Sequence, residues 1–480
     1  MASRRGVSLI APLAQGTARP RNLSTLSRPL RTKLLSPHGS SPAPIANYLI
    51  PSATCSCTIA QQQPSVRYVS DVAHDFQLAQ TPLYDLHLSY GAKIVPFGGY
   101  AMPVLYKDLS LVDSHNWTRE KASLFDVSHM VQHYFSGPRA GLFLERITPS
   151  SATTLAPHTS TLSALLHPQS GGIVDDTIIT ALPGNRFYVV TNAACRDKDA
   201  LYLGRELADF REQTHSTEED VKWERLDGRG LIALQGPLSS EILNNALPKG
   251  VAHNLQTLLF GQSRYFSFEL PSGQFVHDIL ASRGGYTGED GFEISIPAEH
   301  TAAVAEWLLE SAGPDKLRLA GLGARDSLRL EAGMCLYGHD LDDTTTPVEA
   351  ALGWIVAKER REKGGFHGDD VILAQLKTKK NGGTGVSRRR VGLIVEGPPA
   401  REGAEIVEPK GPKGVTIGKV TSGCPSPTLK KNIAMGYIKD GFHKSGTEVE
   451  VVIRGKARKA QVTKMPFVPS KYWKGGLSPA

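Results

Sequence analysis

The sequence predicts an α+β protein that ends in a separate all-β domain. From residue 187 to residue 312, helix-like and strand-like patterns are mixed without the regular spacing of a doubly wound parallel sheet. After Arg390, short strand-like runs alternate with Gly, Pro and Lys, which is typical of a small barrel. The length of 480 residues suggests about three domains of roughly 150 residues each. The chain is therefore long enough to bury a ligand between domains.

The mixed region is expected to contain two helices, at residues 199–210 and 301–312. In the second, apolar residues form one broad face before Gly313-Pro314 ends the pattern. Four strand-like runs accompany the helices, at residues 187–191, 231–234, 265–270 and 292–296.

The C-terminal domain is expected at residues 391–480. A linker at residues 376–390, with Gly382-Gly383 and a dense run of charges, separates it from the mixed region, residues 71–375. The end of the domain is predicted to be a hairpin around Arg454-Gly455-Lys456. Its strands are expected at residues 391–395, 415–420, 433–438 and 448–453.

Residues 1–70 have the composition of a mitochondrial transit peptide. They contain seven Arg, one Lys, eleven Ser and no Asp or Glu. We expect cleavage near residue 68, just after Arg67. The alternative is a basic tail that stays attached, and composition alone does not separate the two.

The positive net charge of the chain comes from this presequence. Residues 1–70 hold eight of the 54 basic residues, which leaves 46 basic and 47 acidic residues and a net charge of −1. The basic excess therefore gives no reason to expect nucleic-acid binding. No stretch of 18 apolar residues predicts a membrane span.

No metal site is expected. Cys195, Cys335 and Cys424 are far apart in the mature chain and form neither a disulfide framework nor a CxxC site. His129 and His133 have the spacing of two metal ligands on a helix. Residues 127–135, however, are rich in β-branched and aromatic residues, so the segment is predicted to be a strand.

Asp175 and Asp176 are adjacent carboxylates in an otherwise apolar strand. Successive side chains of a strand face opposite ways, so the two should not act as a pair on one substrate atom. Because Asp is disfavoured in strands and costly to bury without a partner, one of them is expected to face a site. The alternative is an edge strand with both carboxylates hydrogen-bonded to nearby loops.

Glu293 follows a Gly-dense turn, residues 283–291, at the start of a predicted strand. Alternation places Phe292 and Ile294 in the core and Glu293 on the opposite face. A carboxylate on a rigid strand can accept two N–H groups of a planar heterocycle such as a pterin. The turn lacks both the P-loop and the GxGxxG pattern. Taken alone, Glu293 could equally be a solvent-facing residue.

Arg325 lies near the start of a predicted short helix at residues 324–333. A fixed guanidinium group suits a planar carboxylate or carbonyl acceptor. The alternative is a structural ion pair with Asp326 or Glu331, and the sequence leaves both possibilities open.

Nine segments between residues 81 and 472 resemble, in the same order, those of the glycine-cleavage T-protein family. They are residues 81–85, 124–130, 172–176, 283–293, 324–333, 336–338, 346–349, 421–426 and 464–469. Each segment alone is weakly specific, but nine in one order identify the chain as resembling this family.

The resemblance implies a cloverleaf of three domains around a central folate channel, the last being a Greek-key barrel. In the family, the second Asp of the Asp-Asp pair is catalytic, and it corresponds here to Asp176. Three positions match residues that bind the folate, and two match residues that line the channel. These are Glu293, Arg325 and Tyr472, followed by Met130 and Tyr188.

The resemblance also implies the reaction of a mitochondrial matrix enzyme. An aminomethyl group on the lipoyl arm of H-protein is transferred to tetrahydrofolate, giving 5,10-methylenetetrahydrofolate, ammonia and dihydrolipoyl H-protein, alongside other glycine cleavage proteins. One rival is a folate-dependent sarcosine or dimethylglycine dehydrogenase, whose flavin fingerprint the chain lacks. The other is a non-enzymatic folate-binding protein that supports iron–sulfur cluster assembly.

Overall fold

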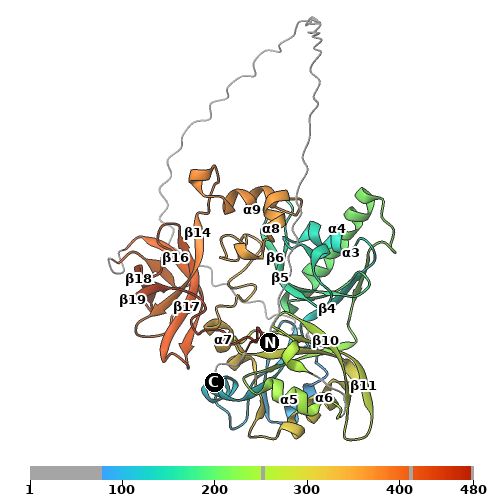
Figure 1. Ribbon diagram of the computed structural model, residues 1–480. Helices are drawn as coiled ribbons and strands as arrows, with labels where there is room; N and C mark the ends of the chain where they lie inside the picture. The colour runs from blue at the N-terminus through green and yellow to red at the C-terminus, as the bar shows by residue number, and fades with distance from the viewer. Residues whose placement is uncertain (1–77, 250–253, 410–413, 477–480) are drawn as a thin grey trace, which may run out of the picture. The chain divides into compact units, whose positions relative to one another are not determined.

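The computed structural model describes residues 78–249, 254–409 and 414–476 (Figure 1). The predicted presequence lies outside the described residues. Within them, helices accompany a six-stranded sheet, a five-stranded sheet, a two-stranded hairpin and a closed barrel. The predicted α+β class with a C-terminal barrel is confirmed. No helix of the described part is long and apolar enough to cross a membrane.

The first sheet has six strands in the order β10-β11-β12-β9-β3-β13, and only β13 is parallel to its neighbour. Helices α5 and α6 pack against one of its faces over a large apolar core that includes Phe292 and Ile294. The elements are β3 (Ala122–Asp126), β9 (Arg229–Gln235), α5 (Ser239–Ala246), β10 (Ser263–Glu269), β11 (Phe275–Arg283), β12 (Gly291–Pro297), α6 (Ala298–Ala312) and β13 (Leu317–Leu319).

The second sheet has five antiparallel strands in the order β5-β6-β7-β4-β8. Phe143 of α3 and Leu203 of α4 belong to its buried core. The elements are β4 (Val131–Ser136), α3 (Ala140–Ile147), β5 (Ser160–Leu166), β6 (Ile173–Leu182), β7 (Arg186–Thr191), α4 (Arg196–Thr214) and β8 (Lys222–Arg225). The chain runs from β3 of the first sheet to β4 of the second and returns from β8 to β9, so the two sheets are intertwined along the sequence.

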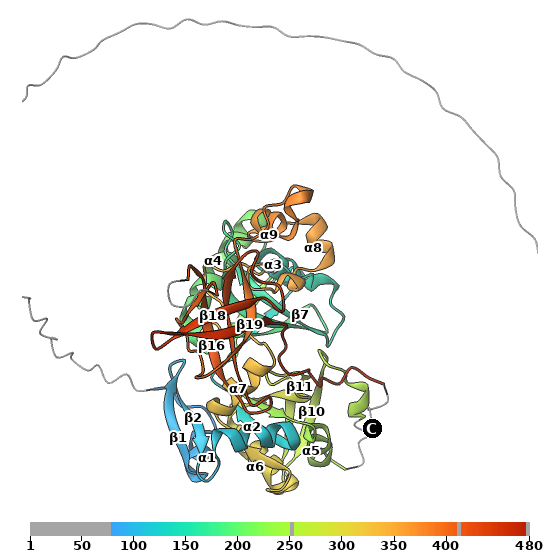
Figure 2. The same cartoon turned by 90° about the vertical axis from the view of Figure 1, so that its left-hand side faces the viewer.

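Shorter elements complete the region before the barrel. Figure 2 shows the hairpin of β1 and β2, in blue, with α1 packed against it. These elements are α1 (Tyr84–Ser89), β1 (Ala92–Phe97), β2 (Tyr100–Tyr106), α2 (Leu111–Glu120), α7 (Leu322–Glu331), α8 (Lys358–Lys363) and α9 (Asp369–Leu376). The predicted helices at residues 199–210, 301–312 and 324–333 correspond to α4, α6 and α7.

The C-terminal domain is a closed barrel in the strand order β14-β17-β16-β15-β18-β19. Ile453 pairs with Lys456 across a two-residue turn in which Arg454 and Gly455 have φ of 50° and 72°. Two positive φ angles are typical of the type I′ turn, so the predicted hairpin is confirmed. The predicted linker at residues 376–390 overlaps the first strand. The strands are β14 (Arg388–Val395), β15 (Glu405–Val407), β16 (Thr416–Ser426), β17 (Lys431–Lys439), β18 (Glu448–Ile453) and β19 (Lys456–Thr463).

Glu331, at the end of α7, joins the barrel to the rest of the protein. Its carboxylate accepts hydrogen bonds from Ser426 at 2.5 Å and from the hydroxyl of Thr428 at 2.8 Å. It also pairs with Arg119 of α2 at 2.8 Å and with His115 at 3.2 Å. Because these partners come from two separate parts of the chain, α2 and the barrel, one buried carboxylate at the end of α7 ties the barrel to α2 and α7.

Candidate active site

Asp175 and Asp176 lie in β6, between β5 and β7, but the pairing with β7 begins only at Ile178, so at the two acids the strand pairs with β5 alone. Asp175 is fully buried and Asp176 is only partly buried, as alternation requires. The side-chain amide of Asn192 nevertheless donates to both carboxylates, at 2.9 Å each. The backbone N–H of Asn192 donates to Asp175 at 2.8 Å. The two acids thus face opposite ways as predicted, but one residue just after β7, Asn192, hydrogen-bonds to both.

The carboxyl group of Asp176 has a pKa near neutral pH. Burial and the charge of Asp175 raise the pKa of Asp176 to about 7, although the hydrogen bond from Asn192 acts in the opposite direction. A carboxyl group with this pKa can hold a proton or release one under physiological conditions.

Glu293 lies on the face of the first sheet that α7 covers. Phe292 and Ile294 point into the core beneath α6, while Glu293 is paired in register with Ala233, which packs against α7 residues. Burial raises the pKa of Glu293, and the charge of Arg325 partly offsets that rise. The alternative of a merely solvent-facing residue is wrong, because α7 crosses the side of the sheet that the strand pattern leaves open.

Arg325 of α7 forms no ion pair with Asp326 or Glu331, the acids near it in sequence. Asp326 pairs with Arg329 at 2.8 Å, and Glu331 is engaged by Arg119. The predicted alternative of an ion pair with either acid is wrong. The guanidinium carbon of Arg325 lies 4.7 Å from the ring centroid of Tyr286, and its buried Nη1 has no hydrogen-bond partner in the described part of the protein.

Tyr286 contacts Arg325 and also feels the charge of Asp176. The sequence did not identify Tyr286 as a candidate residue. It belongs to the loop between β11 and β12, and its hydroxyl donates to the carbonyl oxygen of Cys335. Burial raises the pKa of Tyr286, and the charges of both Asp176 and Arg325 act on it. The Gly-dense turn that contains Tyr286 was the only signal in the sequence. Gly288 in the same turn has a φ of 81°, which favours glycine.

Tyr472 reaches the same loop from the C-terminal tail. The backbone N–H of Lys471 donates to the carbonyl of Gly288 at 2.8 Å. The ring of Tyr472 stacks on Phe260 with centroids 4.1 Å apart. Its buried hydroxyl has no hydrogen-bond partner among the described residues, and burial raises its pKa to about 12.

The two expected channel residues differ in their surroundings. Met130 is partly buried against the cluster that contains Phe125 and the α7 residue Leu328, so it lies on the same side of the sheet as Arg325. Tyr188 is buried, and its hydroxyl donates to Gln132 at 2.8 Å. The hydroxyl of Tyr188 is thus already engaged by the protein, and only its ring is left to shape a channel wall.

His129 and His133 do not share a helix. The expected strand at residues 127–135 is shorter, because β4 begins at Val131 and His129 lies in the turn before it. The Nδ1 of His133 accepts a hydrogen bond from the indole of Trp223 at 3.2 Å. Burial lowers the pKa of His129 to about 4, and the nearby charge of Arg325 contributes. The absence of a metal remains a prediction.

Comparison with known proteins agrees with this architecture. Residues 83–360 match the family model of the GCVT N-terminal domain. Residues 388–469 match that of the glycine cleavage T-protein C-terminal barrel domain. Two intertwined sheets joined to a closed barrel, with these matches in the same order, define a GCVT-type protein.

Individual relatives support a narrower assignment. A probable mitochondrial aminomethyltransferase of Schizosaccharomyces pombe is 50% identical over 405 residues, covering 84% of this chain and 97% of that protein. The mitochondrial aminomethyltransferase of Pisum sativum is 46% identical over 402 residues, covering 84% and 92%. The crystal structure of glycine cleavage system aminomethyltransferase T from Bartonella henselae is 40% identical, covers 82% and 99%, and has a TM-score of 0.71. The chain belongs to the glycine cleavage T-protein family of aminomethyltransferases.

Membership of this family confirms the expected enzyme class, the fold class and the mitochondrial location. The relatives described above are all aminomethyltransferases, so they give no support to a non-enzymatic role in iron–sulfur cluster assembly.

Proposed function

We propose that the enzyme transfers the one-carbon unit of an aminomethyl group on the lipoyl arm of H-protein to tetrahydrofolate. The products are 5,10-methylenetetrahydrofolate, ammonia and dihydrolipoyl H-protein. The observation that carries this proposal is a chain of neighbouring groups: the charge of Arg325 acts on Glu293, Arg325 contacts the ring of Tyr286, and Tyr286 feels the charge of Asp176, a carboxyl group with a pKa of about 7.

The polar groups of the site suit a folate. Buried polar groups in proteins are almost always hydrogen-bonded, so unpartnered ones indicate a ligand. Within the described ranges, the carboxylate of Glu293 makes no hydrogen bond or ion pair, and Nη1 of Arg325 has no hydrogen-bond partner. The hydroxyl of Tyr472 has no partner at normal hydrogen-bond geometry, with Ser470 its nearest candidate. A carboxylate can accept two N–H groups of a pterin, and a guanidinium can bind a planar oxygen acceptor.

The chemistry required of the protein is modest. Tetrahydrofolate supplies the nucleophilic nitrogen, so no covalent enzyme intermediate is needed. Glu293 and Arg325 hold the planar ring so that this nitrogen lies within attack distance of the aminomethyl carbon. Ionised Asp176 stabilises the iminium-like positive charge that develops there, and its pKa allows it to accept or return a proton as ammonia leaves.

The partners follow from the same proposal. The lipoyl arm must reach Asp176 from a docked H-protein, and the other glycine cleavage proteins would load and reoxidise that arm. Transfer between two carriers explains why the site combines buried charged groups with a residue that titrates near pH 7.

The test is an ammonia-release assay with the protein lacking residues 1–68. We expect ammonia only when tetrahydrofolate and aminomethyl-loaded H-protein are both present, in equal amount to the methylenetetrahydrofolate formed. Unloaded H-protein and folic acid serve as the two controls. Rapid ammonia release without folate, or none with both substrates, would overturn the proposal.

A further inference from the structure

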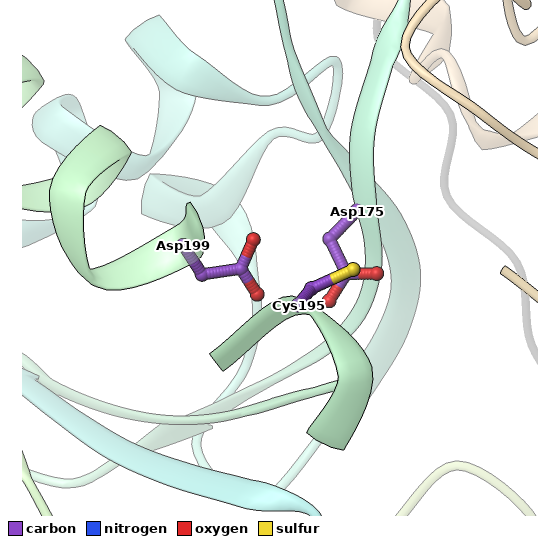
Figure 3. A group of neighbouring side chains, drawn as sticks. All are labelled: Asp175, Cys195 and Asp199. Carbon is purple, nitrogen blue, oxygen red and sulfur yellow. The ribbon is translucent and has the colours of Figure 1, made fainter. Parts of the chain in front are cut away.

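A third carboxyl group, that of Asp199, is buried close to Asp175. Figure 3 shows the side chains of Asp175, Cys195 and Asp199 pointing toward one another, and one carboxylate oxygen of each Asp and the Sγ of Cys195 lie within 4.8 Å of one another. They come from β6, from the 3₁₀ turn Ala193–Cys195 and from the first turn of α4. Asp175 and Asp199 have no exposed surface, and Cys195 is 2% exposed.

The hydrogen bonds of the two acids are unequal. Both oxygens of Asp175 accept hydrogen bonds from Asn192, at 2.8 and 2.9 Å. Neither oxygen of Asp199 has a donor at normal hydrogen-bond geometry among the described residues, although the hydroxyl of Thr191 is near enough to oppose the rise of its pKa. Two ionised carboxylates this close and this buried would repel each other strongly, and one hydroxyl would compensate the charge of Asp199 only in part. One proton between the acids removes both problems, because it halves the charge and supplies the missing donor.

In the part of the chain that the structure describes, no basic side chain takes the place of that proton. Lys198 is the nearest basic residue in sequence, but its ammonium group binds the hydroxyl of Tyr337 at 2.5 Å and the carboxylate of Asp343 at 3.1 Å. Burial raises the pKa of the Cys195 thiol, so it is neutral. The titratable or charged groups that act on the two acids are Asp176, Cys195, Lys198 and Tyr337.

We propose that Asp175 and Asp199 share one proton, and that Asp199 thereby acts as a positioning residue that fixes how much negative charge stands beside Asp176. The proposal rests on the proposed function of Asp176 for its catalytic consequence, but the shared proton does not. Burial raises the pKa of Asp175 and brings that of Asp199 to about 6, as expected for acids that hold a proton between them.

Two substitutions should shift the pH dependence of turnover in opposite directions. Asp199→Asn removes the proton-sharing partner, places a full negative charge on Asp175, and should move the acid limb of the profile upward by about one pH unit. Asp175→Asn leaves the charge on Asp199, farther from Asp176, and should move the limb downward by a similar amount. Residues with a merely structural role would lower stability and leave the limb in place.

The proton itself can be observed by infrared spectroscopy of the whole mature protein at pH 8. The difference spectra of wild type against Asp175→Asn and against Asp199→Asn should each show loss of a carboxylic acid C=O band, whereas Asp176→Asn should retain it. Titrating the wild type to higher pH should remove the same band, which gives a result even if a variant does not fold.

The outcomes separate the two proposals. The shared-proton proposal would be overturned if the wild type showed no carboxylic acid C=O band, or if that band survived in Asp199→Asn. Elemental analysis that finds one divalent metal ion per chain, lost in Asp199→Asn, would overturn it in favour of a metal site. If instead Asp176→Asn keeps normal turnover while the band behaves as expected, the proposed role of Asp176 fails and the shared proton stands.

Discussion

The guanidinium group of Arg325 lies 4.7 Å from the centroid of the Tyr286 ring, which is a cation–π contact. The acids near Arg325 in sequence pair with other basic residues instead. The hydroxyl of Tyr286 is itself held by the carbonyl of Cys335. The ring therefore orients Arg325 without neutralising it. A cation that is positioned but unpaired retains its full hydrogen-bonding capacity for a ligand.

Folate affinity should depend on Arg325 and Glu293. Arg325→Ala and Glu293→Gln should each weaken tetrahydrofolate binding by about 1 to 3 kcal/mol, the range for losing a charged hydrogen-bond partner. Isothermal titration calorimetry measures the effect. Glu299→Gln is the matched control, because Glu299 is exposed at the start of α6. Unchanged affinity in both folded site variants would count against their assignment.

Tyr286 offers a way to separate the cation–π contact from the hydroxyl. Tyr286→Phe keeps the ring under Arg325 and should leave folate affinity nearly unchanged, while losing a hydrogen bond worth about 1 kcal/mol of stability. Tyr286→Leu removes the ring and should weaken folate binding by about 1 kcal/mol. Equal affinities for the Phe and Leu variants would show that the ring does not orient Arg325.

Strand alternation predicted part of this site correctly. It placed Phe292 and Ile294 in the core and Glu293 opposite, as β12 shows. It did not predict what covers that opposite face, because α7 begins some 30 residues later and reaches β12 only through the packing of the first sheet. Periodicity describes which way a side chain points, but not which distant element it meets.

The link between Asp175 and Asp176 shows the same limit. The pattern of β6 correctly separates their burial, yet Asn192 joins them from the end of β7. That contact follows from the pairing of β6 with β7, in which Ile178 faces Val190. An Asn that follows a strand is common, so nothing in the local sequence marks it as a partner.

The presequence should be dispensable for the folded enzyme. Residues 1–70 carry eight basic and no acidic residues, and the family match begins at residue 83. Protein starting at residue 69 should be soluble and as active as longer protein in the ammonia-release assay. In cells it should fail to enter mitochondria, which fractionation measures. Loss of soluble folding in the shortened protein would contradict the prediction.

Glu331 should stabilise the attachment of the barrel in a pH-dependent way. Burial alone would raise the pKa of Glu331, but His115 and the hydroxyls of Ser426 and Thr428 lower it to about 2. Because the folded-state pKa is depressed, the ionised carboxylate stabilises the fold at pH values above 4.5, the ordinary pKa of a glutamate. This contribution is lost as the pH falls toward 2.

Glu331→Gln should therefore reduce the free energy of unfolding by about 2 kcal/mol at pH 7, since it removes one of the two buried carboxylates that pair with Arg119 and leaves only Glu289. Denaturant titrations at pH 7 and pH 3 should show the difference from wild type shrinking at the lower pH. A difference that stays constant between these pH values would exclude the charge of Glu331 as its cause.

The most direct prediction concerns Asp176. If its ionised form stabilises the developing positive charge, wild-type turnover should rise with pH until the group titrates at about 7, and fall about tenfold per pH unit below that value. Asp176→Asn keeps the shape and the contact with Asn192 but removes the charge. Turnover at saturating substrates should fall by about 10²- to 10⁴-fold, and the acid limb should disappear.

The choice of control for this variant follows from Asn192. Asp175→Asn is unsuitable, because the shared amide and the charge of Asp175 both act on Asp176. Asp315→Asn is better, since Asp315 is exposed on a turn before β13. It should have wild-type turnover and the same pH profile. Folate affinity should change much less than turnover in Asp176→Asn, because Glu293 and Arg325 are the residues proposed to bind the folate. Near-normal turnover of Asp176→Asn, or an acid limb that persists in it, would show that another group performs the proton transfer.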